Sequence, residues 1–365
     1  MISTPPASNE VEVSVFGPGV GECIVVHLGD GDWLVVDSCI DRRSGKPIAL
    51  LYLNSIGVDI ATQVKMVVAS HWHDDHIEGL NEIFDAAKSA VFVNSDAHPL
   101  RDLAQLAGLG AKLRQSSATK AYADILDILD SRRGPKTRKQ SVGPMGAIAD
   151  RRLLLLPAAQ RTIVAEVYSL SPSDGVVAIA RSELSSAMTA VQNNRRPVRQ
   201  GPNQLCVALW VKVGKLDLLL GADLEQRQAP NEGWNAIVHS TGRPQELACF
   251  FKVPHHGSQN AHSDECWSKM LNTKAVAVIT PFSKSSLPTP QDVTRIIGLT
   301  NSAYLTCDPA TFSLAKYPNP VGKQIKQQVI ARNPLTGATG QVCFRADALN
   351  GTSHSVTLWD GARSL

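Results

Sequence analysis

The chain has 365 residues, enough for one large domain or for a domain with an appendage. Hydrophobic residues make up 43% and charged residues 19%, which is typical of a globular protein with a buried core, and the net charge of +3 is too small to predict nucleic-acid binding on its own. Seven cysteines without a CxxC pair, a polar start and no apolar stretch of membrane-spanning length favour a cytoplasmic protein with reduced thiols and no membrane contact.

Apolar periodicity and turn residues predict the elements in chain order. A β-meander opens the chain, with strands expected at 11–16, 23–28 and 33–36. Later strands are expected at 64–69, 90–93, 152–156, 162–170, 205–213, 215–220, 249–253 and 275–280, and a final β-hairpin within 340–365. Helices are expected at 48–56, 81–88, 100–107, 122–129, 182–192, 262–271 and 291–299. Strands that alternate with helices predict a layered α/β architecture.

The segment SHWHDDH, residues 70–76, carries the sharpest chemical signal. Imidazole nitrogen and carboxylate oxygen are the usual ligands of zinc and similar metals. His71 and His73 are two residues apart and follow an apolar strand, which puts both rings on one side of the chain. Asp75 and His76 lie in the following turn and can reach a second point nearby. A polar surface loop is the alternative, but three of the ten histidines within six residues favour metal binding.

Two later strand ends extend this pattern. Asp223 follows the apolar segment 218–220 and could bridge two cations, although a helix N-cap is the plain alternative. His255 and His256 follow the strand 249–253; we prefer His255 as the ligand, with the choice between the two left open. Asp37 ends the strand 33–36, and we expect it to orient the metal loop through hydrogen bonds rather than to serve only as a turn residue.

The order of these motifs resembles the metallo-β-lactamase superfamily: HxHxDH, then a strand followed by Gly-x-Asp, then a strand followed by His-His-Gly-Ser. Residues 16–22, 35–37, 203–223 and 252–258 are most similar to the hydrolase domain of bacterial DNA-uptake competence proteins, here in stand-alone form. The resemblance implies an αββα sandwich of two mixed β-sheets flanked by helices. It spans about residues 11–299, so we expect a hydrolase domain at 11–300 and a C-terminal β extension at 301–365 packed on the same domain. The chain departs from the superfamily in lacking a histidine between His98 and Asp223, a feature shared with the competence branch.

These residues imply a metal-dependent hydrolase with two divalent ions, zinc or manganese, that activate water. His71 and His73 would hold one ion, Asp75, His76 and His255 the other, and Asp223 both. Asp75 and Asp223 would therefore also be catalytic. Contacts to the substrate are expected from His256, Lys284 or Ser258, in no fixed order, and His262 is a further candidate.

The first hypothesis for the reaction is cleavage of a phosphodiester, with DNA or RNA as the partner. Two basic segments, 132–139 and 195–199, could contact phosphates, although each is equally well explained as a solvated charge cluster. The second hypothesis is hydrolysis of a small ester, lactone or amide, because one fold hosts many reactions. The third is an effector component of a multi-protein system whose activity a partner triggers.

Overall fold

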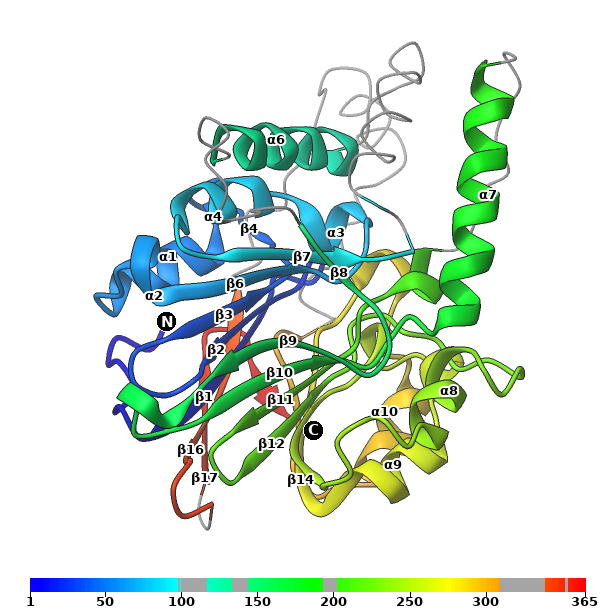
Figure 1. Ribbon diagram of the computed structural model, residues 1–365. Coiled ribbons are helices and arrows are strands. Elements are labelled where there is room, and N and C mark those ends of the chain that lie inside the picture. Colours follow the sequence, from blue (N-terminus) through cyan, green and yellow to red (C-terminus); the bar gives the residue numbers. More distant parts are fainter. Residues whose placement is uncertain (98, 100–116, 133–143, 193–201, 309–338, 352–353) are drawn as a thin grey trace, which may run out of the picture.

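Two large mixed β-sheets form the centre of the computed structural model, which describes residues 1–97, 99, 117–132, 144–192, 202–308, 339–351 and 354–365 (Figure 1). The described strands of the first sheet are, in spatial order, β17 (His354–Trp359), β16 (Gly340–Asp347), β1 (Glu10–Gly17), β2 (Cys23–His27), β3 (Trp33–Val36), β6 (Val64–Ala69), β7 (Val91–Ser95) and β8 (Met145–Ala147). Those of the second are β18 (Arg363–Ser364), β15 (Ala303–Leu305), β14 (Leu271–Ile279), β13 (Ala248–Lys252), β12 (Leu216–Leu220), β11 (Leu209–Val213), β10 (Ala165–Ser169) and β9 (Arg151–Leu156). A short ribbon pairs β4 (Ile40–Asp41) with β5 (Lys46–Pro47).

Helices cover the outer face of each sheet (Figure 1). On the first sheet lie α1 (Ile48–Ser55), α2 (Ile60–Gln63), α3 (Asp74–Ile77), α4 (Leu80–Ala86) and α6 (Ser117–Arg132). On the second lie α8 (Gly233–His239), α9 (Asp264–Met270) and α10 (Pro290–Ile297), and α7 (Asp174–Gln192) stands to one side. The expected architecture, two mixed sheets flanked by helices, is therefore confirmed.

Strand alternation explains how the layers hold together. In β3, Leu34 and Val36 point into the core between the sheets, whereas Trp33 and Val35 pack against the helices. In β12, Leu218 likewise faces the inner core. Successive side chains of a strand point to opposite faces of its sheet. A strand that is apolar throughout is therefore buried on both faces, as expected for a sheet that lies between a second sheet and a layer of helices.

The direction of the strands creates one functional edge. In the first sheet β3, β6, β7 and β8 run parallel, and in the second β12, β13, β14 and β15 do so. The carboxyl ends of parallel strands lie at the same edge of a sheet, and loops that leave such an edge commonly carry ligand-binding residues. We therefore expect a functional site in the loops that follow β3, β6, β12 and β13.

Most sequence-based elements agree with the structure, with a few differences. The segment 205–208 is not strand, because a 3₁₀ turn η2 (Pro202–Leu205) precedes β11, and α7 begins eight residues before the expected helix. The helix expected at 100–107 lies outside the described residues. The tail pairs with both sheets, since β16 adds to β1 and β18 adds to β15. The division of the chain near residue 300 stays a prediction.

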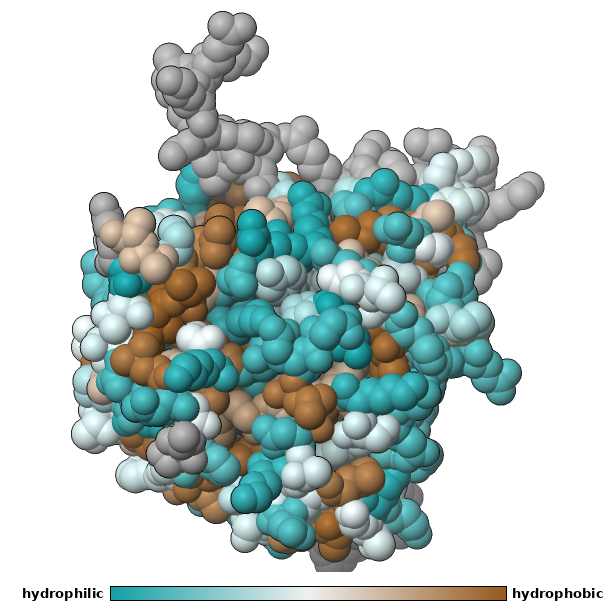
Figure 2. Space-filling view, turned by 60° about the horizontal axis from the view of Figure 1, so that its bottom comes forward, coloured by the Kyte–Doolittle hydropathy of each residue, from teal (hydrophilic) through white to brown (hydrophobic). Residues whose placement is uncertain are grey.

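The surface in Figure 2 is a mosaic of hydrophilic and hydrophobic residues, as most protein surfaces are. The large apolar side chains that are exposed come from well-separated segments, among them Leu155, Ile179, Leu247 and Trp359. All seven cysteines are free thiols. None of the helices in the described part of the chain combines the length and apolarity needed to cross a membrane.

Candidate metal centre

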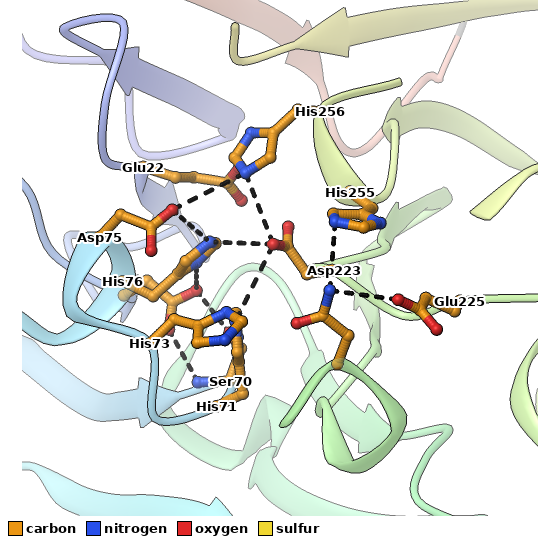
Figure 3. Close-up of polar contacts among 12 residues, drawn as sticks. Glu22, Ser70, His71, His73, Asp75, His76, Asp223, Glu225, His255 and His256 are labelled. Carbon is orange, nitrogen blue, oxygen red and sulfur yellow. Dashed lines mark hydrogen bonds and ion pairs between the residues drawn. The ribbon is translucent and has the colours of Figure 1, made fainter. Parts of the chain in front are cut away.

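Polar side chains from four strand ends meet at the functional edge defined above (Figure 3). Asp37 follows β3, and His71 and His73 follow β6. Asp223 follows β12, and His256 follows β13. Because both sheets contribute, the site lies where the two halves of the sandwich meet, and its geometry depends on the whole fold.

The backbone is bent at this edge. Asp37, Ala222, His255 and His256 all have positive φ, at 59°, 45°, 46° and 56°. Residues other than glycine rarely adopt this conformation, and such strain gathers at functional sites, where the surrounding structure maintains it. Gly221 is required for a related reason: a Cβ there would lie 2.9 Å from the carbonyl oxygen of Lys252, because β12 and β13 approach closely.

Asp37 orients two of the histidines from beneath. Its Oδ2 lies 2.7 Å from His76 Nδ1 and accepts a hydrogen bond of 2.6 Å from Ser70 Oγ, while its Oδ1 accepts from the Ser70 backbone N–H at 2.7 Å. Because the hydroxyl proton of Ser70 goes to Asp37, Ser70 Oγ accepts from His71 Nδ1, 3.0 Å away. Both imidazoles therefore point Nδ1 at these partners and Nε2 at the cluster, which is how metal-binding histidines are held. This placement fits the role expected for Asp37.

Asp223 is the centre of the cluster. Its Oδ2 lies 3.4 Å from Nε2 of both His76 and His256 and 3.9 Å from His71 Nε2. Asp75 Oδ2 lies 3.7 Å from His76 Nε2 and 3.8 Å from His256 Nε2. These distances exceed the roughly 2.9 Å of a good hydrogen bond. They match the separation of two ligands on one zinc ion, about 3.4 Å for bonds of about 2.1 Å at a tetrahedral angle.

Two candidate cation groups lie around Asp223. The first group is His71, His73 and Asp223, in which His71 Nε2 and His73 Nδ1 are 3.0 Å apart. The second group is Asp75, His76 and His256, to which Asp223 also lies close. Within each group the ligand atoms lie no more than 4.8 Å from one another.

Buried polar atoms without partners show that the donor set suits cations. His76 Nε2 and Asp223 Oδ1 are buried and have no hydrogen-bond partner among the residues that the structure describes. Leaving such atoms unpaired is costly, so each one calls for an explanation. Carboxylate oxygens and imidazole nitrogens are among the ligands that zinc and similar divalent metals prefer. The residues present therefore fit a dinuclear metal centre.

The choice between the tandem histidines is corrected by the structure. The ring of His256 is buried, stacks on Phe282 with centroids 4.9 Å apart, and has Nδ1 2.8 Å from the carbonyl oxygen of Thr280, so its Nε2 faces the cluster. His255, which we preferred from the sequence, instead lies with Nε2 3.1 Å from Asn203 Nδ2. The two consecutive positive φ angles turn neighbouring imidazoles in different directions. The structure therefore brings His256, and not His255, into the candidate cation groups of the described residues.

The other residues that we expected to contact the substrate are Lys284, His262 and Ser258. Lys284, in the turn η5 (Ser283–Ser285), is exposed, and its Nζ lies 5.9 Å from the ring centroid of Phe282, which stacks on His256. His262 pairs with Asp264 at the start of α9, 2.9 Å away, and forms part of none of the candidate cation groups in the described residues. Ser258 is half-buried in the turn after His256. The roles of Lys284 and Ser258 stay predictions.

Sequence reasoning missed two fully buried charges beside the cluster, Glu22 and Lys252. Glu22 forms a candidate cation group with Asp223 and His256, and its carboxylate pairs with Lys252 at 2.6 Å. Lys252 gave a usable signal, because a lysine inside the apolar strand 249–253 must find a partner when buried. Nothing in the sequence identified Glu22 as that partner.

Charge coupling sets the protonation of the cluster. Burial alone would lower the pKa of His76 and of His256, but the nearby carboxylates, chiefly Asp223, outweigh it and raise both pKa values above the ordinary range. Burial alone would raise the pKa of Asp223. The charges on His256 and His76 outweigh burial and hold the pKa of Asp223 well below its usual range. For His71, burial lowers the pKa, so this ring stays neutral.

We therefore expect cation uptake to release protons. In the metal-free protein the raised pKa values favour a proton on both ring nitrogens of His76 and of His256. A cation must displace these protons to reach the Nε2 lone pairs, so affinity should rise with pH until the raised pKa values are passed. Isothermal titration calorimetry at pH 6, 7 and 8, in buffers of different ionisation enthalpy, should show proton release on cation binding that is larger at the lower pH values. Heats that do not depend on the buffer at pH 6 and 7 would contradict this protonation pattern.

Part of the chain resembles a known protein family. The family model of the metallo-beta-lactamase superfamily matches residues 16–125, which include the HxHxDH loop. No curated protein matches the sequence. Among solved structures, the chain is similar to the metallo-beta-lactamase fold protein YhfI from Bacillus subtilis, with 14% identity, 81% of this chain and 95% of that chain covered, and a TM-score of 0.36. It is also similar to metallo-beta-lactamase SMB-1 bound to 2-mercaptoethanesulfonate, with 12% identity, 69% of this chain and 81% of that chain covered, and a TM-score of 0.31. For the archaeal metallo-beta-lactamase superfamily protein ST1585 from Sulfolobus tokodaii, the identity is 11%, the covered shares are 61% of this chain and 67% of that chain, and the TM-score is 0.27. Residues 16–125 of this chain are therefore similar to the metallo-beta-lactamase superfamily, whose members are generally metal-dependent hydrolases.

Proposed function

We propose that this protein is a phosphodiesterase, acting as a nuclease on DNA or RNA, that uses two divalent cations, zinc or manganese, to activate water. The observation that carries the proposal is the pair of cation groups that share Asp223. A pair of cations held by these residues would supply the charge stabilisation that suits in-line displacement at phosphorus.

The protein's own residues would hold and orient this centre. His71, His73 and Asp223 would hold one cation, and Asp75, His76, His256 and Asp223 the other. Bound divalent cations supply Lewis acidity and lower the pKa of water to about 7, which makes a nucleophile available at neutral pH. Asp37 and the Thr280 carbonyl keep the imidazoles in the tautomer that leaves Nε2 free. Asp75 and His73 are only partly buried, and we propose that the substrate approaches the cluster from their side.

Exposed positive charge near the cluster supports an anionic substrate. Lys284 is exposed next to Phe282, which stacks on His256, so its ammonium group can contact a phosphate held at the cations. The basic segment 195–199 and residues 133–139 of the other basic segment lie outside the described residues. Arg132 is used for packing, since its guanidinium lies 4.0 Å from the ring centroid of Phe84.

The resemblance to the competence hydrolase domain supports the same reaction. The four segments that carry it, 16–22, 35–37, 203–223 and 252–258, supply residues that meet at this site, among them Glu22, Asp37, Asp223 and His256. We also propose that 11–300 is the hydrolase domain, with 301–365 as its β extension. Free thiols at all seven cysteines fit a reducing compartment, such as the cytoplasm.

Hydrolysis assays with defined metals test the proposal. The purified protein, loaded with Mn²⁺ or Zn²⁺, is expected to cleave bis(p-nitrophenyl) phosphate and at least one of plasmid, single-stranded DNA and RNA. His256→Ala should abolish this activity, because it removes a ligand of the second cation. His239→Ala is the matched control, since His239 is an exposed histidine at the end of α8 that contacts Glu265 rather than the cluster. Turnover of lactones or esters with no phosphodiester cleavage would replace the proposed function by the small-ester alternative.

A further inference from the structure

Glu22 lies in the loop between β1 and β2 and is brought against the metal loop by the backbone. Its side chain is fully buried, and its backbone N–H donates to the carbonyl oxygen of Asp75 at 3.0 Å. The preceding Gly21 has φ +105°, and a Cβ there would lie 2.8 Å from the Cβ of Cys39. Only glycine allows the chain to pass this closely, so the loop is built to deliver Glu22 to the cluster.

One oxygen of the Glu22 carboxylate is fully used. Oε2 lies 2.6 Å from Lys252 Nζ, and both side chains are completely buried. The same oxygen accepts a hydrogen bond of 2.5 Å from Thr280 Oγ1. Lys252 Nζ also donates to the Val253 carbonyl at 2.9 Å. These contacts fix the position of the carboxylate and neutralise its charge on one side.

The other oxygen, Oε1, is buried without a hydrogen-bond partner in the part of the chain that the structure describes. In this it resembles His76 Nε2 and Asp223 Oδ1, the unpartnered atoms of the metal centre. Glu22, Asp223 and His256 each offer a ligand atom within 4.8 Å of the others. Figure 3 shows the Glu22 side chain running in beside the His256 ring toward the space between Asp75 and Asp223.

We propose that Glu22 is a ligand of the second cation, the one held by Asp75, His76 and His256, and that Lys252 orients it. A carboxylate that binds a metal through one oxygen and accepts hydrogen bonds through the other is a common arrangement, because the outer partners hold the ligand in position. The competing explanation is an ion pair that only clamps the loop after β1 to strand β13. That explanation leaves Oε1 without a partner, whereas coordination satisfies it.

Two single variants distinguish the ligand from the clamp. Glu22→Gln keeps an oxygen for Lys252 and Thr280 but removes a negative charge from the cluster, so affinity for the second cation should fall at least about tenfold. Lys252→Met removes a positive charge beside the cations and leaves Glu22 in place, so the affinity should stay equal or increase. A clamp predicts the same direction for both variants, because each breaks the same ion pair.

Calorimetric titration of the metal-free full-length chain with Mn²⁺ gives stoichiometry and affinity without any assay of activity. The absorption spectrum of the Co²⁺-loaded protein gives a second readout, since loss of a ligand should change its d–d bands in Glu22→Gln. Should Glu22→Gln fail to fold, Lys252→Met carries the test: its metal-free form should melt below wild type, and saturating Mn²⁺ should raise its melting temperature by more than it raises that of wild type.

The inference rests on the proposed metal centre, and the outcomes separate the two. Wild-type protein that binds no cation would overturn the metal centre and the proposed function together. Wild-type protein that binds two cations, with Glu22→Gln binding both at wild-type affinity and with an unchanged Co²⁺ spectrum, would overturn only the role of Glu22. An equal loss of affinity in Glu22→Gln and Lys252→Met would also overturn it, in favour of the clamp.

Discussion

Asp223→Asn is expected to lose cation binding and hydrolysis almost completely. Asp223 Oδ2 lies 3.4–3.9 Å from the Nε2 atoms of three histidines, so this one oxygen serves both cation groups. Removing one partner from a buried charge network costs about 3–5 kcal/mol. At about 1.4 kcal/mol for each tenfold change, cation affinity should fall by about two to three and a half orders of magnitude. Elemental analysis after dialysis against Mn²⁺, together with bis(p-nitrophenyl) phosphate turnover, measures both losses.

Asp217→Asn is the matched control for this variant. Asp217 is a buried carboxylate on the same strand, β12, but it accepts a hydrogen bond of 2.7 Å from the Trp210 indole N–H, which the asparagine oxygen can also accept. Metal content and activity should therefore stay near wild type. An Asp223→Asn protein that retains two cations would show that Asp223 is not the shared ligand, and the two-cation mechanism would need a different bridge.

The fold was predictable to the extent that its strands are apolar and regular. The strand that precedes the metal loop was expected at 64–69 and is β6, Val64–Ala69. Five of its six residues are apolar, and a short apolar run of this kind is typical of a buried strand. Short elements were missed where no periodicity can develop. The helix α3 has only four residues and carries Asp75 and His76, so it read as a turn. Its helical form follows from contacts outside the segment, such as Ser38 N–H donating to the His76 carbonyl.

The metal loop could be predicted because its candidate ligands are close together in the sequence. The sequence could not show which of His255 and His256 faces the cluster. Both tandem histidines follow the same strand and have the same chemistry. What separates them is the positive φ at each position and the distant partners that each ring finds, Thr280 for His256 and Asn203 for His255. The position of Glu22 was even less predictable from the sequence. Its ion pair with Lys252 joins residues that are 230 positions apart, and these meet only when the two sheets pack together.

Replacing Asp37 should separate the stability of the site from its ability to bind cations. Asp37 accepts three hydrogen bonds, two from Ser70 and one from His76, in a fully buried position. Asp37→Ala leaves these donors unpaired at a cost of about 1–3 kcal/mol each. We therefore expect a lower free energy of unfolding for the metal-free protein, measured by urea denaturation. Cation affinity should also fall by about 10–100-fold, because His76 and His71 lose the partner that orients them.

Asp37→Asn separates the effect on stability from the effect on cation binding. Its amide oxygen can still accept from the Ser70 backbone N–H, so stability should recover in part relative to Asp37→Ala. The amide nitrogen, however, then faces His76 Nδ1 and donates to it, which moves the imidazole proton to Nε2. A protonated Nε2 cannot bind a cation, so affinity should stay low although the protein is more stable. Cation affinity that recovers in parallel with stability would show that Asp37 acts only by holding the fold together, whereas a stable Asp37→Asn protein with weak binding would show that it sets the tautomer of the ligand.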